Sequence, residues 1–288
     1  MLNDLTISKV SQRRFLNVSD VFKLILLGTG GPRLTTTPPR GGPSQLIVAG
    51  DDVILIDCGS GTTLNLVRAG FKPHQVHNLF FTHIHHYDHN ADYISFIFEN
   101  WIWGYEADAY QPLNVYGPKG TKKFNDRTIN QAYGEEVKLR MSYGKLDPRF
   151  SENYHAPTIN ITELEGGAVC KEKGWTATST KVPHGPNALA YRVDSDHKSI
   201  VVSGDLSELA TLTEFAHKAD VFVIDAMHPS GEDIGKTAAA AQVKTLVLSH
   251  IIYGWFNHTL DIKAKIKLIK EYYTGNVVVG QDLMTFTV

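Results

Sequence analysis

The chain has 288 residues, with 28 lysines and arginines against 30 aspartates and glutamates, and its formal net charge is −2. This balance argues against a basic face that binds nucleic acid regardless of its sequence, so we do not expect nucleic acid as a partner, although the balance is compatible with a local basic patch. The only cysteines are Cys58 and Cys170, which excludes both a disulfide scaffold and a cysteine-rich zinc site.

The first twenty residues are expected to be an extension of one domain that spans residues 1–288. Met1 to Arg14 is polar and mixed, without the apolar core of a secretory signal. No stretch of the chain reaches the ~18 apolar residues of a membrane span. We therefore expect a cytoplasmic protein that does not contact a membrane, although a removed export signal would leave no trace here.

In the first half of the chain, short apolar runs predict strands at 22–27, 44–48, 53–56, 76–81 and 113–116. Between them, helices are predicted at 62–69 (closed by Gly70), at the aromatic segment 91–105, and at 121–133.

In the second half, strands are predicted at 176–182, 188–193, 199–202, 221–224, 243–248 and 276–279, with helices at 231–242 and 262–272. The strands 188–193 and 199–202 should form a hairpin. Strands dominate the early part and alternate with helices later. This order favours an α+β fold in which two facing mixed sheets carry helices on their outer sides.

Acidic residues and histidines recur where apolar strands end. Asp57, Asp205, Asp225 and His250 each follow such a strand. Strand ends that meet at one edge are the usual place for a site in proteins that contain both helices and sheets. We therefore expect several of these side chains to meet, while Asp225 alone is also typical of an ordinary turn.

A dense cluster follows the strand 76–81. Residues 83–89 read His-Ile-His-His-Tyr-Asp-His, so four histidines and one aspartate lie within seven positions. Imidazole and carboxylate are the usual ligands of zinc and similar cations. The cluster predicts a metal site, and its density favours two metals over one.

Six motifs together give the chain a family resemblance. They are Leu27-Gly28-Thr29-Gly30-Gly31-Pro32, Ile56-Asp57-Cys58-Gly59, Thr82-His83 through His89, Val182-Pro183-His184, Val202-Ser203-Gly204-Asp205 and Leu248-Ser249-His250. In order and spacing, residues 22–288 resemble the metallo-β-lactamase fold superfamily, and within it the ribonuclease Z-like and arylsulfatase-like branch. The resemblance implies a four-layer αβ/βα sandwich with a two-metal groove at one edge.

The resemblance also implies a ligand set. One metal would be held by His83, His85 and His184, and the other by Asp88, His89 and His250. Asp205 would bridge the two metals, and Asp57 would orient ligands by hydrogen bonding. Two zinc ions are expected, with iron or manganese as alternatives.

One departure from the family concerns the histidine motif, which is His-x-His-x-Asp-His in the family. Here one extra residue separates the first histidine from Asp88, so either His85 or His86 is the ligand. An extended backbone would place His83 and His85 on the same face, and this favours His85.

The expected chemistry is attack by a hydroxide that bridges the two metals. Asp88 could assist the leaving group, and His228 could donate a proton or contact the substrate. Aromatic residues after the cluster and after His250 suggest a small substrate with an apolar or aromatic group. The expected substrate contacts are Trp101, Trp103, Trp255 and His258.

The leading interpretation is a zinc-dependent hydrolase of a small ester-type substrate, namely a phosphodiester, sulfate, carboxylic ester or lactone. One alternative is a tRNA 3′-processing endonuclease. Against it, the chain has no Gly/Pro/Lys-rich arm, and Asp225-Ala226-Met227-His228 replaces the His-Glu-Ala-Thr-like motif of those enzymes. A second alternative is a non-catalytic metal-binding sensor or interaction protein. The family resemblance suggests a homodimer.

Overall fold

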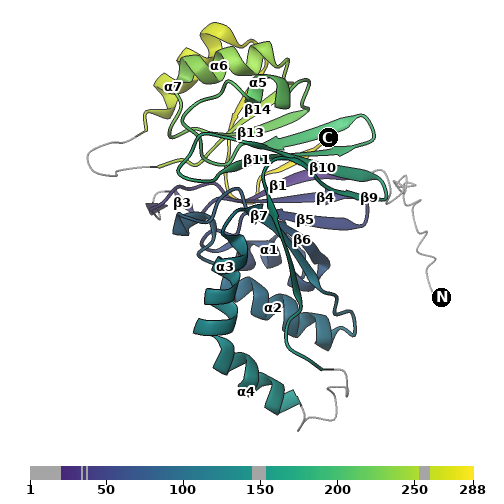
Figure 1. Cartoon of the computed structure of the whole chain (residues 1–288). Helices are drawn as coiled ribbons and strands as arrows, with labels where there is room; N and C mark the ends of the chain where they lie inside the picture. The colour runs from purple at the N-terminus through teal and green to yellow at the C-terminus, as the bar shows by residue number, and fades with distance from the viewer. Residues whose placement is uncertain (1–20, 34, 37, 145–153, 253–259) are drawn as a thin grey trace, which may run out of the picture.

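Two seven-stranded sheets face each other in the computed structural model, which describes residues 21–33, 35–36, 38–144, 154–252 and 260–288 (Figure 1). The first sheet has the order β16 (Thr285–Thr287), β1 (Phe22–Gly28), β4 (Ser44–Ala49), β5 (Asp52–Ile56), β6 (Val76–Phe80), β7 (Leu113–Pro118) and β8 (Ile159–Leu164). The second has the order β15 (Asn276–Val279), β14 (Thr245–Ser249), β13 (Val221–Asp225), β12 (Lys198–Val202), β11 (Leu189–Ser195), β10 (Trp175–Lys181) and β9 (Gly167–Glu172). The short strands β2 (Thr35–Thr36) and β3 (Pro39–Arg40) pair with each other.

The two sheets follow the same plan. In the first, pairing is antiparallel from β16 to β5 and parallel from β5 to β8. In the second, pairing is antiparallel from β9 to β12 and parallel from β12 to β15. Each sheet therefore has a parallel half, and the carboxyl ends of these parallel strands lie along one edge.

Helices cover the outer faces of both sheets. On the first sheet lie α1 (Thr62–Arg68), α2 (Tyr93–Glu106) and the single turn η2 (Pro73–Gln75). On the second lie α5 (Leu212–Phe215), α6 (Gly231–Ala240) and α7 (Ile262–Tyr272). After β7 the chain forms α3 (Thr121–Asn125), the π-helical segment η4 (Asp126–Ala132) and α4 (Gly134–Gly144), which extends away from the sheets (Figure 1).

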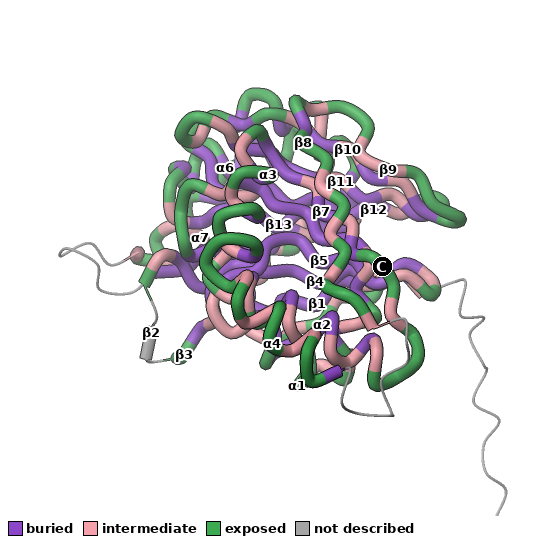
Figure 2. Tube along the Cα trace, turned by 60° about the horizontal axis from the view of Figure 1, so that its bottom comes forward, coloured by how far each residue is buried: buried purple, intermediate pink, exposed green. Residues whose placement is uncertain are grey.

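The side-chain alternation of the strands builds three apolar layers. In β1, Leu24 and Leu26 point into the core between the sheets, whereas Ile25 and Leu27 pack under the outer helices. Most strand residues of both sheets are buried, whereas the outer faces of the helices are exposed (Figure 2). The predicted α+β class, with two facing mixed sheets and outer helices, is confirmed.

Several elements differ from the sequence prediction. The predicted helix 121–133 is helical from Thr121 to Ala132, but it changes from α to π geometry at Asp126. The strands β8, β9 and β16 and the helices α4 and α5 were not predicted. β8 and β9 are edge strands with few buried side chains, so they lack the apolar pattern on which strand prediction depends. Among the described residues, no helix combines the length and apolar content that crossing a membrane requires.

Candidate metal centre

The polar strand ends meet at one edge of the two sheets. Asp57 follows β5 and His83 lies just beyond β6 in the first sheet. In the second sheet Asp205 follows β12, Asp225 ends β13 and His250 follows β14. Because these strands are parallel within each sheet, their carboxyl ends bring the side chains together.

The first group of side chains that could hold a metal contains His83, His85 and His184, whose nearest ring nitrogens all lie within 4.8 Å of one another. Burial lowers the pKa of His85 to about 4, and the neighbouring His86 makes the second-largest contribution to this shift. Burial also lowers the pKa values of His83 and His184. At neutral pH the three imidazoles are therefore uncharged, which is the form that binds metal.

The second group contains Asp88, His89, Asp205 and His250, all buried, with ligand atoms again within 4.8 Å of one another. His250 Nε2 lies 3.3 Å from Asp88 Oδ2, and His89 Nε2 lies 3.9 Å from the same oxygen. This group mixes anionic carboxylates with imidazoles, so it would offset more of a cation's charge than the first group.

Asp205 lies between the two groups. Its Oδ1 is 3.1 Å from His89 Nε2, and its Oδ2 is 3.4 Å from His250 Nε2. The same Oδ2 is 3.7 Å from His184 Nε2 and 4.0 Å from His83 Nε2. One carboxylate thus faces ligands of both groups, which is the position required of a bridging ligand.

Unpaired polar atoms show that these residues fit a metal. Buried atoms without a hydrogen-bond partner in the described part of the chain include His83 Nε2, His89 Nε2, His184 Nε2, Asp88 Oδ1 and Asp205 Oδ1. Buried polar atoms are normally paired, because leaving them unpaired costs a few kcal/mol each. A divalent cation in each group would satisfy them together.

Asp57 orients two of the histidines. His89 Nδ1 donates to Asp57 Oδ2 at 2.7 Å, so the Nε2 lone pair of His89 faces the site. Thr82 donates to the same carboxylate through its backbone N and its Oγ1, both at 2.8 Å. Thr82 Oγ1 also lies 3.0 Å from His83 Nδ1. Thr82 therefore belongs to the network that orients the histidines. The sequence analysis did not predict this role, and the only sequence signal for it is the position of Thr82 directly before His83.

Asp225 has the corresponding role in the second sheet. Its Oδ2 accepts a 2.6 Å hydrogen bond from His228 Nδ1, and its Oδ1 lies 3.5 Å from His250 Nδ1. Burial acts to lower the pKa of His228, but the hydrogen bond and charge of Asp225 outweigh it and raise that pKa. From sequence Asp225 had two interpretations. Its position at the end of a site-forming strand is the signal that identifies the functional one.

The extra residue of the histidine motif lies at the exposed side of the site. The ring of His86 is 4.5 Å from that of His85 and 5.4 Å from that of His184. After it, the single turn η3 (Tyr87–His89) returns Asp88 and His89 to the buried side. Among the described residues, His85 and not His86 completes a group with ligand spacing.

The structure does not bring the predicted tryptophans to the histidines. Trp101 is fully buried, and its Nε1 donates to the carbonyl of His155. Trp103 donates to Glu99 and lies under Lys72, which precedes β6 at the end of that strand opposite His83. Both are residues of α2, and these partners of their side chains are not residues of the metal groups. Trp255 and His258 lie outside the described residues.

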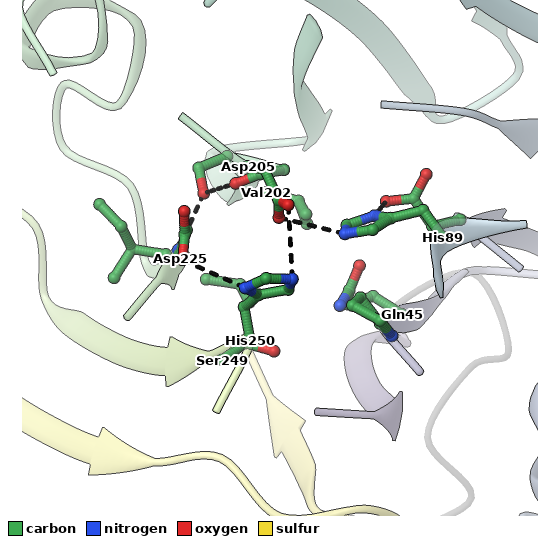
Figure 3. Close-up of a pocket in the computed structure, with 13 residues that line it drawn as sticks. Gln45, His89, Val202, Asp205, Asp225, Ser249 and His250 are labelled. Atoms are coloured by element: carbon green, nitrogen blue, oxygen red, sulfur yellow. Dashed lines mark hydrogen bonds and ion pairs between the residues drawn. The ribbon is translucent and has the colours of Figure 1, made fainter. Parts of the chain in front are cut away.

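A small cavity of about 20 Å³ lies behind the second group, lined by residues that include Gln45, His89, Asp205, Asp225 and His250 (Figure 3). This volume is close to that of a single water molecule, so the cavity cannot admit a substrate. The exposed residues His85, His86 and His228 do not line this cavity, and a substrate would reach the metal groups past them.

Comparisons with known proteins identify the family and the fold. A family profile described as the metallo-beta-lactamase superfamily matches residues 37–250. Ribonuclease Z of Mycobacterium avium is 30% identical, over 91% of this chain and 97% of that protein. The metallo-beta-lactamase fold protein YhfI of Bacillus subtilis is 19% identical and superposes with a TM-score of 0.70, covering 93% of this chain and 100% of its own. The short form of human tRNase Z is 17% identical, with a TM-score of 0.64 over 92% and 98%.

These relatives correct one expectation from the sequence. Nucleic acid was not expected as a partner because the net charge is −2, yet curated relatives along most of the chain are named Ribonuclease Z. The physical reason is that net charge sums the whole surface. A small cationic area beside a site is cancelled by acidic residues elsewhere, although an RNA strand would meet only the local area.

Proposed function

The chain belongs to the metallo-β-lactamase superfamily, and we therefore propose that it is a zinc-dependent hydrolase of phosphodiester bonds in RNA. The proposed reaction is the endonucleolytic removal of the 3′ extension of a precursor tRNA. The observation that supports this substrate over a small ester is the likeness to ribonucleases Z, which extends over 91% of the chain.

In the proposed site, His83, His85 and His184 would hold one zinc ion, and Asp88, His89 and His250 would hold the other. Asp205 would be a ligand shared by the two groups, since its oxygens face histidines of both. When bound, two divalent cations supply Lewis acidity, which polarises a phosphoryl oxygen and lowers the pKa of water. The buried unpaired ring nitrogens and carboxylate oxygens support this ligand set.

The remaining residues position groups and hold protons. Asp57 keeps the Nδ1 proton of His89 turned away from the site. Asp225 does the same for His228, and its hydrogen bond and charge raise the pKa of that imidazole above the usual value. His228 lies beside the rings of His184 and His250. We assign it the role of proton donor to the leaving ribose oxygen, with Asp88 as a ligand beside that oxygen.

The test is a cleavage assay on a precursor tRNA that carries a 3′ extension, with zinc-loaded protein and sequencing of both products. We expect a single cut at the end of the acceptor stem, abolished by a chelator and restored by zinc. Mature tRNA without the extension is the matched control. Failure to cut the precursor, together with turnover of small nitrophenyl phosphodiesters, would reject the RNA substrate and leave a small-ester hydrolase.

A further inference from the structure

A short cationic stretch lies next to the metal groups and has no part in the site described above. We call residues 119–127 the basic segment. It follows β7, and β7 pairs in parallel with β6, the strand that leads to His83. The basic segment therefore leaves the sheet at the same edge as the histidine cluster.

Contacts fix the start of the basic segment beside the exposed side of the site. A Cβ on Gly120 would lie 3.2 Å from Ile84 Cδ1, one residue from both His83 and His85. The side-chain amide of Asn187 donates to the carbonyl of Lys119, and Asn187 lies in the loop that carries His184. The segment thus borders both loops that supply the first metal group.

The side chains of the basic segment are available for a ligand. Lys119, Lys122, Lys123 and Arg127 are all exposed, and none of them forms an ion pair with another residue that the structure describes. The single acid of the segment, Asp126, already accepts hydrogen bonds from Asn130 and Gln131.

One glutamate of β8, Glu163, lies against the basic segment and offsets part of its charge. Glu163 accepts from the backbone amides of Gly120 and Lys122, which holds the backbone of the segment rather than its cationic side chains. Glu165 pairs with Lys181. The four cations still outnumber the two acids, Asp126 and Glu163, in a chain whose net charge is −2.

We infer that the basic segment binds the phosphate backbone of the RNA next to the bond that is cut. This inference rests on the proposed function. A phosphate placed at the metal groups would leave the neighbouring phosphates of the strand over residues 119–127, where exposed lysines can replace their counterions. The segment would thereby provide a local RNA-binding surface that is not evident from the net charge of the whole chain.

The test compares K122Q/K123Q with K171Q/K173Q, all in zinc-loaded protein. Lys171, in β9, and Lys173, in the turn that follows it, are also exposed, and β10 runs from that turn towards His184. Binding is measured by fluorescence anisotropy with an RNA hairpin that ends at its stem and so cannot be cut. Affinity is followed between about 50 and 200 mM salt.

For K122Q/K123Q we expect roughly tenfold weaker binding at low salt, and a slope of log affinity against log salt that is smaller by about two. For K171Q/K173Q both quantities should match the wild type. A structural defect alone would not change the salt slope, and thermal melts check that both variants fold.

Two outcomes separate this inference from the proposed function. If wild-type protein cuts precursor tRNA while K122Q/K123Q keeps both its affinity and its salt slope, the basic segment is not the RNA contact and the function stands. If wild-type protein neither binds nor cuts RNA, the proposed function itself fails. Equal losses in both double variants would indicate a diffuse charge effect and would also overturn the inference.

Discussion

At the scale of single residues, Asp225 is the carboxylate that we expect to orient two histidines of the site. It contacts both His228 and His250 from the end of β13. Orienting carboxylates of this kind often contribute 10–100-fold to metal affinity or activity. We predict that Asp225→Asn lowers kcat on precursor tRNA by about that factor and lowers zinc occupancy at the second group.

The measurement combines initial rates with zinc content by mass spectrometry. Asp196→Asn is the control, because Asp196 lies in the exposed turn between β11 and β12 and asparagine tolerates its φ of 53°. An Asp225→Asn protein with wild-type rate and full zinc would show that the carboxylate orients nothing of consequence.

The extra residue of the motif gives a second test at this scale. We predict that His85→Ala loses about one zinc ion per chain and nearly all activity, because His85 completes the first group. His86→Ala should keep its zinc, since His86 lies outside that group in the described structure. Zinc content per chain decides between them, and the opposite pattern would make His86 the ligand.

At the scale of elements, the turn after β12 lies directly against Thr82, the residue that precedes the histidine cluster. Gly204 has φ +60°, and a Cβ there would lie 2.6 Å from Thr82 Cβ. Thr82 in turn contacts Asp57 and His83. Any side chain at position 204 would therefore push against the network that orients the metal ligands.

We predict that Gly204→Ala lowers the free energy of unfolding by more than the ~1–2 kcal/mol of left-handed backbone strain alone. It should also reduce zinc content. Gly174→Ala is the matched control, because Gly174 has φ +96° but open space around it. Urea unfolding of both variants separates the clash from the strain. If both variants lose the same free energy of unfolding, the structure accommodates the added methyl group next to Thr82 without a measurable clash.

A hydrogen bond between the two sheets supports the same region. The buried Tyr191 hydroxyl of β11 donates to the carbonyl of Phe81 at 2.8 Å, just before the histidine cluster. We predict that Tyr191→Phe lowers the free energy of unfolding by about 1 kcal/mol, since a buried acceptor loses its donor. Tyr143→Phe, at an exposed position, should change nothing, and a loss of similar size there would contradict this account.

At the scale of the whole molecule, the metal groups join the two sheets. Their ligands come from both sheets, so bound zinc would stabilise the folded chain over the unfolded one. We predict that a chelator lowers the melting temperature, with a loss of about 2.7 kcal/mol for each zinc site relative to protein at zinc concentrations about a hundredfold above Kd. Calorimetry with and without chelator measures this, and an unchanged melting temperature would argue against zinc between the sheets.

Much of the architecture was already readable from the sequence. The helix 262–272 and the strand 276–279 have the predicted bounds, because their apolar spacing is regular and their flanks are polar. The two-sheet class followed from the order of the elements. Edge strands such as β8 and β9 were missed because solvent covers much of their surface and leaves little apolar pattern.

For the site, the density of histidines at 83–89 was enough to indicate metal chemistry, since few other roles require so many imidazoles together. Only the tertiary structure decided what surrounds them. It placed Asp225 against two histidines, buried Trp101 on the inner face of α2, and set lysines of residues 119–127 beside the exposed side. The physical reason is that a residue's ability to bind a metal depends on its own side chain, which the sequence shows directly. The orientation of the ligands and the access of a substrate depend on which strand ends, distant in sequence, the fold brings to one edge.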